Sequence, residues 1–187
     1  MPTAILLLAA GASRRFGPQN KLLAQFEGRP LLRHAADAAR AVPAEMYLAV
    51  VSDPAVAVLL PDFRKVLVTP GQPQSESLKA GIAVAEAMNA GRVLVVLADM
   101  PRVTSALIAE VLARGATESA AATDGRRITP PACLTATIFA QIRSLTEDQG
   151  AGALLRQLPK TQLVITGPAT LIDIDTVADL TALVPQS

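Results

Sequence analysis

The chain has 187 residues, of which 51% are hydrophobic but only 3% aromatic, and its 17 Lys and Arg nearly balance 16 Asp and Glu. The resulting net charge of +1 argues against a surface that coats nucleic acid and against a polybasic membrane patch, because both need clustered positive charge. A single cysteine excludes an internal disulfide framework and a zinc site built from several cysteines.

The length predicts one domain that spans residues 1–187. The apolar stretch 4–10 is too short to cross a bilayer, and no basic segment precedes it as in a signal peptide. We therefore expect a cytoplasmic protein without membrane or nucleic-acid partners.

Short continuous apolar runs alternate along the chain with helical patterns. The runs, which are typical of strands covered on both faces, are 5–10, 46–51, 66–68, 93–98 and 163–165. Apolar residues at helical spacing predict helices around 32–39, 78–85 and 107–112. Asp53 before Pro54, and Thr176 with Asp179, are typical of helix starts. This alternation predicts a three-layer, mostly parallel α/β sheet.

A loop rich in small residues follows the first predicted strand. Small residues allow a triphosphate to approach the backbone, whose N–H groups bind its oxygens. We expect nucleotide contacts from Leu8, Ala9, Ala10, Gly11, Ala12, Ser13 and Arg14. Arg15 and Lys21 would supply the positive charge that phosphoryl transfer needs for catalysis. The alternative is an ordinary βα turn with solvated basic residues. The loop lacks the Gly-Lys-Ser/Thr of a Walker A motif and the glycine spacing of a dinucleotide fingerprint.

Acidic residues follow two later apolar segments. Asp99 comes directly after the strand at 93–98, where a carboxylate can hold Mg²⁺. The alternative is that Asp99 caps the helix that begins near Thr104. Asp173 and Asp175 alternate in direction if this segment is extended, so only one can face the substrate. We choose Asp175 as the second metal ligand, with a helix cap as its alternative.

The polar turn at 71–78 leads into a predicted helix. Its residues Gln74, Ser75 and Ser77 are candidates for contacts to a base or ribose, although one serine is expected to cap the helix. Two other residues receive no functional role: His34 is read as a surface or helix-end histidine, and Cys133 as a small packed residue.

Three motifs occur in order over nearly the whole chain: Leu8-Ala9-Ala10-Gly11-x-Ser13-x-Arg15-Phe16-Gly17 with Lys21, then Ala98-Asp99-Met100-Pro101, then Asp173-Ile174-Asp175-Thr176. Together they resemble the molybdenum cofactor nucleotidyltransferases. The cytidylyltransferase branch is favoured by Ala9-Ala10-Gly11, by Gln74-Ser75-x-Ser77-Leu78-Lys79-Ala80-Gly81 and by the acidic-glycine turn Glu147-Asp148-Gln149-Gly150-Ala151.

The resemblance implies a Rossmann-like sheet with one reversed strand. It also implies transfer of CMP from CTP to the phosphate of molybdopterin carrying molybdenum, with release of pyrophosphate. Arg15 and Lys21 would bind the triphosphate, and Asp99 and Asp175 would hold Mg²⁺. The phosphorylated pterin acceptor would be one partner, and a molybdoenzyme or its chaperone a further one.

The sequence is compatible with other functions as well. The nearest alternative is a related enzyme. It would be either a guanylyltransferase of the same family or a cytidylyltransferase that acts on another small phosphorylated acceptor. A nicotinamide-dependent oxidoreductase would need a Gly-x-Gly-x-x-Gly motif after the first strand, which is absent. A nucleotide-binding module without activity would bind NTP and release no pyrophosphate.

Overall fold

The computed structural model describes residues 1–187 except 12, 14, 18, 146–151 and 184–187. Within this part, seven strands form one sheet in the order β5-β4-β1-β6-β8-β7-β9, and a small hairpin pairs β2 with β3. Neighbouring strands run parallel except at β8, which is antiparallel to both β6 and β7. The prediction of a mostly parallel Rossmann-like sheet with one reversed strand is therefore confirmed.

The bounds of the elements are as follows. The strands are β1 Thr3–Ala9, β2 Gln25–Phe26, β3 Arg29–Pro30, β4 Met46–Val51, β5 Arg64–Leu67, β6 Arg92–Leu97, β7 Ala120–Thr123, β8 Ile128–Thr135 and β9 Leu163–Ile165. The α-helices are α1 Leu31–Arg40, α2 Pro54–Val58, α3 Gln74–Ala87, α4 Ser105–Arg114, α5 Phe139–Arg143, α6 Gly152–Leu155 and α7 Val177–Leu183. Short 3₁₀ turns occupy Lys21–Leu23, Ala136–Ile138, Lys160–Gln162 and Pro168–Leu171.

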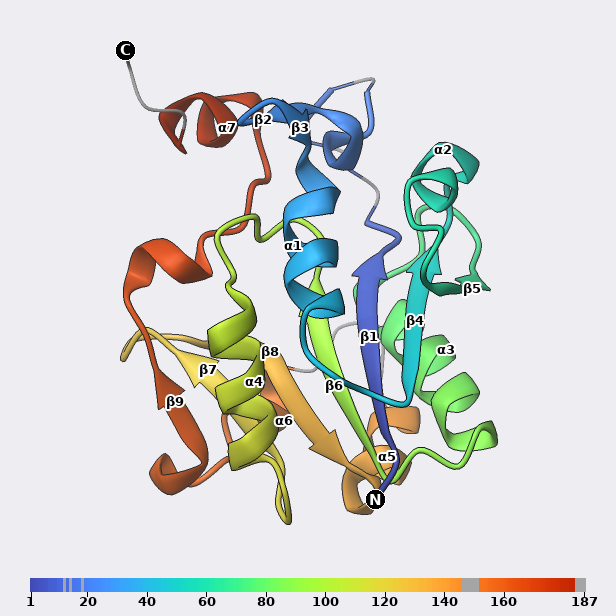
Figure 1. Cartoon of the computed structure of the whole chain (residues 1–187), viewed down its shortest axis with the longest axis vertical. Coiled ribbons are helices and arrows are strands. Elements are labelled where there is room, and N and C mark those ends of the chain that lie inside the picture. The colour runs from blue at the N-terminus through green and yellow to red at the C-terminus, as the bar shows by residue number, and fades with distance from the viewer. Residues whose placement is uncertain (12, 14, 18, 146–151, 184–187) are drawn as a thin grey trace.

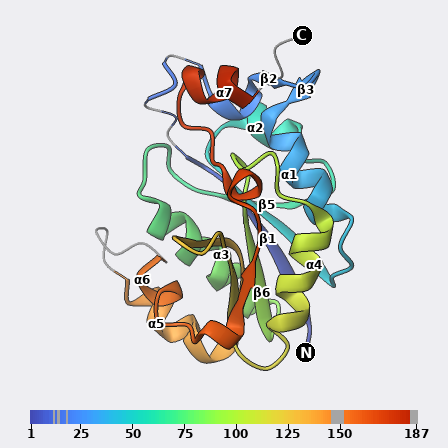
Figure 2. The ribbon, with the colours of Figure 1, turned by 90° about the vertical axis from the view of Figure 1, so that its left-hand side faces the viewer.

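Helices cover both faces of the sheet. The helices α1 and α4 lie on one face, and α3, α5 and α6 lie on the other (Figures 1 and 2). Alternate residues of β1 enter the two cores: Ile5 and Leu7 pack toward α1 and α4, whereas Leu6 and Leu8 pack toward α3. This two-sided burial explains why the strands appear in the sequence as continuous apolar runs.

The expected strands and helices occur close to their predicted positions. Asp53 accepts a hydrogen bond from the N–H of Ala55 and so caps α2, with Pro54 in the first turn. Thr176 and Asp179 form a reciprocal capping box, because each side chain accepts a hydrogen bond from the backbone N–H of the other.

Two strands of the sheet were not predicted. β7 is Ala120–Thr123, whose small side chains give little strand signal. β8 contains Pro130 and Pro131, and proline is a residue that argues against a strand in a sequence. In the structure both prolines lie between Thr129 and Ala132, the two residues of β8 between which the pairing with β7 shifts register. Proline has no N–H to donate, so a bulge is where a strand tolerates it.

His34, expected to be a surface or helix-end histidine, is buried instead. It lies on α1 with 9% of its surface exposed, its Nε2 is 2.9 Å from the carbonyl oxygen of Phe26, and its ring packs edge-on against that of Phe26. The histidine therefore fastens the β2–β3 hairpin to α1. Cys133 is buried as predicted, and burial raises its pKa to about 11. Among the described residues, no helix has the length and apolar character to span a bilayer.

The carboxyl ends of β1 and β6 form the rim on which a site is expected. The chain leaves β1 to pair with β4 on one side and later returns to pair with β6 on the other. Strand order thus reverses at β1, and ligands of open α/β sheets bind beyond the strand ends at such a point.

Gly81 sets how closely α3 approaches β1 beneath that rim. A Cβ added at Gly81 would lie 2.5 and 2.6 Å from the two Cδ atoms of the fully buried Leu6.

Gly81→Ala gains about 1 kcal/mol of helix propensity but incurs about 1–3 kcal/mol of overpacking. We expect a net loss of stability in urea unfolding. Leu6→Val should cost less in the Gly81→Ala background than alone, and a Gly81→Ala protein more stable than wild type would contradict this packing.

Candidate functional site

A cavity of about 320 Å³ opens at the carboxyl ends of β1 and β6. Leu8 and Leu97 are paired in register on these strands, so both side chains reach the cavity at the same level. The lining is Leu8, Ala10, Gly11, Ser13, Arg15, Lys21, Leu22, Gln72, Gln74, Ser77, Leu97, Asp99 and Asp175. We call this the first cavity.

The loop after β1 is shaped around Ser13. Ser13 has a φ of 47°, in the left-handed region that is uncommon for residues other than glycine. Its carbonyl oxygen accepts a hydrogen bond from the N–H of Phe16, and its hydroxyl oxygen accepts one from the N–H of Lys21. Asn20 caps the following 3₁₀ turn and donates to Asp53 at the start of α2. These contacts fix the backbone from which the Lys21 side chain extends.

The ammonium group of Lys21 lies between two carboxylates from distant parts of the chain. Its Nζ is 2.7 Å from Oδ2 of Asp99 and 2.9 Å from Oδ1 of Asp175. The Lys21 side chain is only 7% exposed, against 22% for Asp99 and 30% for Asp175. Arg15 binds Asp175 from the solvent side at 2.6 Å, with 72% of its side chain exposed. Such an exposed pair contributes little stability, so Arg15 can exchange partners readily.

Backbone contacts place both carboxylates. The N–H of Ala98 donates to the carbonyl oxygen of Leu8, which continues the pairing of β1 and β6 up to Asp99. The N–H of Ile174 donates to the carbonyl oxygen of Asp99 at 2.9 Å and so docks the segment that carries Asp175. Thr104, rather than Asp99, caps α4 through the N–H of Leu107.

Burial and charge act on Lys21 and Asp99 in different ways. Burial lowers the pKa of Lys21, but the charges and hydrogen bonds of Asp99 and Asp175 outweigh it and raise that pKa above its ordinary value. Burial raises the pKa of Asp99, and the opposing effect of Lys21 does not cancel it. Lys21 is thus a fixed cation at neutral pH, while Asp99 takes up a proton at a higher pH than an ordinary aspartate.

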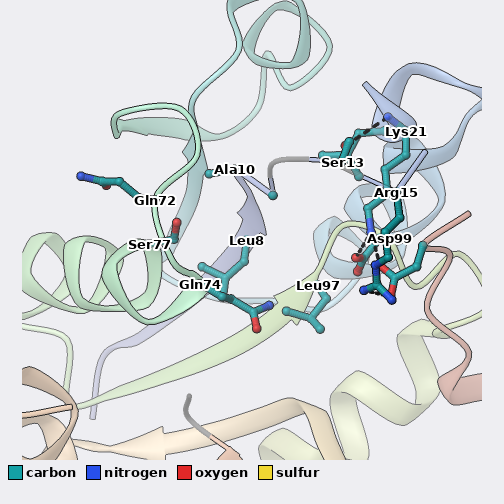
Figure 3. Close-up of a pocket in the computed structure, with 13 residues that line it drawn as sticks. Leu8, Ala10, Ser13, Arg15, Lys21, Gln72, Gln74, Ser77, Leu97 and Asp99 are labelled. Atoms are coloured by element: carbon teal, nitrogen blue, oxygen red, sulfur yellow. Dashed lines mark hydrogen bonds and ion pairs between the residues drawn. The ribbon is translucent and has the colours of Figure 1, made fainter. Parts of the chain in front are cut away.

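The first cavity has a charged side and a neutral polar side. Figure 3 shows Lys21, Arg15 and Asp99 grouped together, with Gln72, Gln74 and Ser77 across from them. Leu8 and Leu97 lie between the two groups (Figure 3). The arrangement suits a ligand with an anionic tail and an uncharged, hydrogen-bonding head.

Most of the residues singled out in the sequence meet in this cavity, with specific exceptions. The side chain of Ala9 packs in the core with α1 and α4 instead of lining the cavity. Ser75 lines a neighbouring cavity. Ala12, Arg14 and the turn at 147–151 lie outside the described residues. Leu22 and Leu97 also line the cavity and were not predicted, although Leu97 lies at the level of Leu8 once β1 and β6 are paired.

The segment that carries Asp173 and Asp175 is not a strand. It continues from the 3₁₀ turn Pro168–Leu171 without regular structure. Both carboxylates line the neighbouring cavity of about 400 Å³, whereas Asp175 alone of the two lines the first cavity. Asp173 pairs with Arg127 at 3.0 Å, whereas Lys21 pairs with Asp175.

The carboxylates of Asp99 and Asp175 are suited to a divalent cation. Both already converge on one positive group, Lys21, and carboxylate oxygens are the donors that Mg²⁺ prefers. Within the described ranges, no cluster of three or more His, Cys, Asp or Glu side chains could hold a metal by itself. One or two carboxylates completed by substrate phosphates is the usual Mg²⁺ arrangement, so the residues fit the ion.

Comparison with known proteins agrees with this fold. A MobA-like NTP transferase domain model matches residues 5–162. Rv0371c from Mycobacterium tuberculosis H37Rv has a similar structure, with a TM-score of 0.85 and 23% identity over 100% of both chains. A manganese complex of Rv0371c has a TM-score of 0.79 and 22% sequence identity over 98% of both chains. A nucleotidyl transferase from Methanothermobacter has a TM-score of 0.78 and 19% sequence identity over 97% of this chain and 95% of its own. No curated protein matches the sequence.

The sheet, the cavity at its switch point and the paired charges define a protein of the nucleotidyltransferase class. The chain belongs to the MobA-like NTP transferase domain family, whose model covers most of its length.

Replacing Lys21 by methionine should leave two carboxylates close together without their shared cation. We expect Lys21→Met to lose about 1–3 kcal/mol of unfolding free energy at pH 7. Without Lys21, the folded-state pKa of Asp99 lies further above its unfolded value, so this loss should shrink as the pH falls toward about 4, where aspartate is protonated. Urea unfolding of both proteins at several pH values measures this loss of unfolding free energy.

Lys79→Met is the control, because Lys79 pairs with Glu76 on α3, where both side chains are partly exposed and neither lines the first or the second cavity. It should change stability by less than about 0.5 kcal/mol at any pH. A Lys21→Met deficit that stays constant or grows on acidification would contradict the proposed charge balance.

Proposed function

We propose that this protein transfers CMP from CTP to the phosphate of molybdopterin carrying molybdenum, and releases pyrophosphate, with Mg²⁺ as its metal. One observation carries the proposal: Lys21 and Arg15 meet Asp99 and Asp175 at one end of the first cavity. Family membership makes an NTP and a phosphorylated acceptor the substrate classes.

The reaction needs positioning and charge neutralisation more than a protein nucleophile. An oxygen of the acceptor phosphate attacks the α-phosphorus of CTP, the bond from that phosphorus to the β-phosphate oxygen breaks, and pyrophosphate leaves with the electron pair. The attacking phosphate is already ionised at neutral pH, so no general base is required. Negative charge spreads over the phosphate oxygens in the transition state, and fixed cations stabilise it.

Lys21 and Arg15 are the cations for this purpose. Lys21 is buried and held by two carboxylates, so its charge is already in place before substrate binds. Arg15 is mostly exposed and can turn from Asp175 to a phosphate. Asp99 and Asp175 would hold the divalent ion, which supplies further neutralisation of the triphosphate when bound. The manganese complex of Rv0371c supports a divalent metal in this group of proteins.

The neutral side of the first cavity would hold the cytosine and ribose. Gln72, Gln74 and Ser77 offer amide and hydroxyl groups there, across from the charged residues (Figure 3). The preference for CTP is supported by the resemblance of the segment from Gln74 to Gly81 to the cytidylyltransferase branch.

Pyrophosphate release, assayed with CTP, GTP, ATP and UTP in the presence of molybdopterin and Mg²⁺, tests the proposal. Turnover restricted to another nucleotide, or none with molybdopterin, would refute it.

Asp99→Asn should lower kcat by on the order of 100-fold or more, because the amide keeps the shape of the side chain but loses the charge that would hold the metal. Its thermal unfolding should stay close to that of the wild type. Pyrophosphate release under saturating CTP measures the effect. Asp62→Asn, at an exposed carboxylate outside both cavities, is the control and should retain full activity. Wild-type turnover by Asp99→Asn would remove Asp99 from the mechanism.

A further inference from the structure

Two cavities share one rim at the carboxyl edge of the sheet. The second cavity, of about 400 Å³, shares six lining residues with the first: Leu8, Arg15, Gln74, Leu97, Asp99 and Asp175. Two serines on α3 separate them: Ser77 lines only the first cavity and Ser75 only the second. Residues two apart on a helix lie on different sides of it, which explains the division.

Ser75 is a polar group that the fold itself leaves unsatisfied. It is 3% exposed, and its hydroxyl has no hydrogen-bond partner in the part of the chain that the structure describes. It lies in the first turn of α3, a helix of 14 residues whose N-cap, Pro73, provides no side-chain hydrogen bond. A buried hydroxyl without a partner lowers stability, so its presence beside a cavity needs an explanation.

The remaining walls of the second cavity indicate what its occupant looks like. Part of its lining is apolar and comes from Leu78, Val95, Ala132, Leu134 and Leu155. The carboxylate of Asp173, fixed by Arg127, adds a hydrogen-bond acceptor on the wall. A ring with a flat apolar face, N–H groups for the carboxylate and a carbonyl or ring nitrogen for the serine would satisfy these walls. A sugar would bury hydroxyls against leucine and valine side chains at a cost.

We propose that the second cavity binds the ring of the acceptor, a nitrogen heteroaromatic, and that the Ser75 hydroxyl donates a hydrogen bond to it. The proposal rests on the transferase function proposed above and gives Ser75 an acceptor role in place of its expected nucleotide role. The acceptor phosphate then reaches the shared rim, where Arg15 and the α-phosphate of the nucleotide meet.

Ser75→Ala tests this assignment, with Ser77→Ala as the matched control on the same helix. Without ligands, Ser75→Ala should unfold at the same temperature as the wild type or higher, because it removes an unsatisfied buried group. It should leave the Kd for CTP in Mg²⁺, measured by calorimetry, within twofold. It should raise the KM for molybdopterin about five- to tenfold, the equivalent of one hydrogen bond. Ser77→Ala should instead weaken CTP binding.

Two outcomes of these measurements would overturn the proposal. One is a weaker CTP affinity in Ser75→Ala, as in Ser77→Ala, which would return Ser75 to the nucleotide. The other is a lower unfolding temperature with unchanged KM, which would make Ser75 structural. Mannose 1-phosphate offered as acceptor should give no pyrophosphate, and turnover with it would contradict a cavity for a heteroaromatic ring.

A direct binding measurement separates this proposal from the transferase function. Titration with 2-amino-4-oxopteridine, followed by its fluorescence, should saturate with the wild type and be weakened about five- to tenfold by Ser75→Ala. If the wild type binds this pterin but releases no pyrophosphate, the transferase proposal fails and the ring subsite stands. If wild type and Ser75→Ala bind it equally, or neither binds it, the ring subsite is refuted.

Discussion

The shared ion pair of Lys21 with Asp99 and Asp175 is the contact on which the architecture of this site depends. It joins the loop after β1, the end of β6 and the segment before α7, which are separated by 78 and 154 positions along the chain. Two carboxylates brought this close would repel one another, and the buried ammonium is what allows them to coexist. The same carboxylates are the ones suited to a divalent ion, so Lys21 and a metal would share these two partners. A triphosphate that draws Lys21 and Arg15 to its own oxygens would release both carboxylates for the metal.

The sheet decides how the rest of the site is divided. Strand order reverses at β1, so the loop after β1 and the end of β6 open onto one rim while α3 approaches it from one face. The reversed strand β8 then contributes Thr129, Pro130 and Ala132 to the second cavity. Charged groups gather where the two cavities meet, neutral polar groups lie on α3, and apolar groups line the second cavity. The proposed reaction, which joins two phosphates that belong to different molecules, would make use of this division.

Much of this could be predicted from the sequence because the signals are local. The strands β1, β4 and β6 are buried on both faces, so each appears in the sequence as a continuous apolar run. Because these strands are parallel, the residues that follow them lie at the same edge of the sheet. Other features depend on contacts that the sequence does not display. The pairing of β8 with β7 absorbs two prolines in a bulge, and the burial of His34 depends on a hairpin carbonyl. Ala9 and Ser75 belong to segments whose neighbouring residues line the first cavity, but the direction of each side chain is set by the register of β1 and by the packing of α3. Asp173 shares a cavity with Asp175 because their segment is irregular.

The most direct test of the central claim is a crystal structure of the protein with CTP and Mn²⁺, in which anomalous scattering locates the metal. The account predicts one manganese peak bound by Asp99 and Asp175, with the Lys21 ammonium moved from these carboxylates to a phosphate oxygen of the same nucleotide. A triphosphate bound away from Lys21, or a metal bound elsewhere while Lys21 still bridges Asp99 and Asp175, would contradict it.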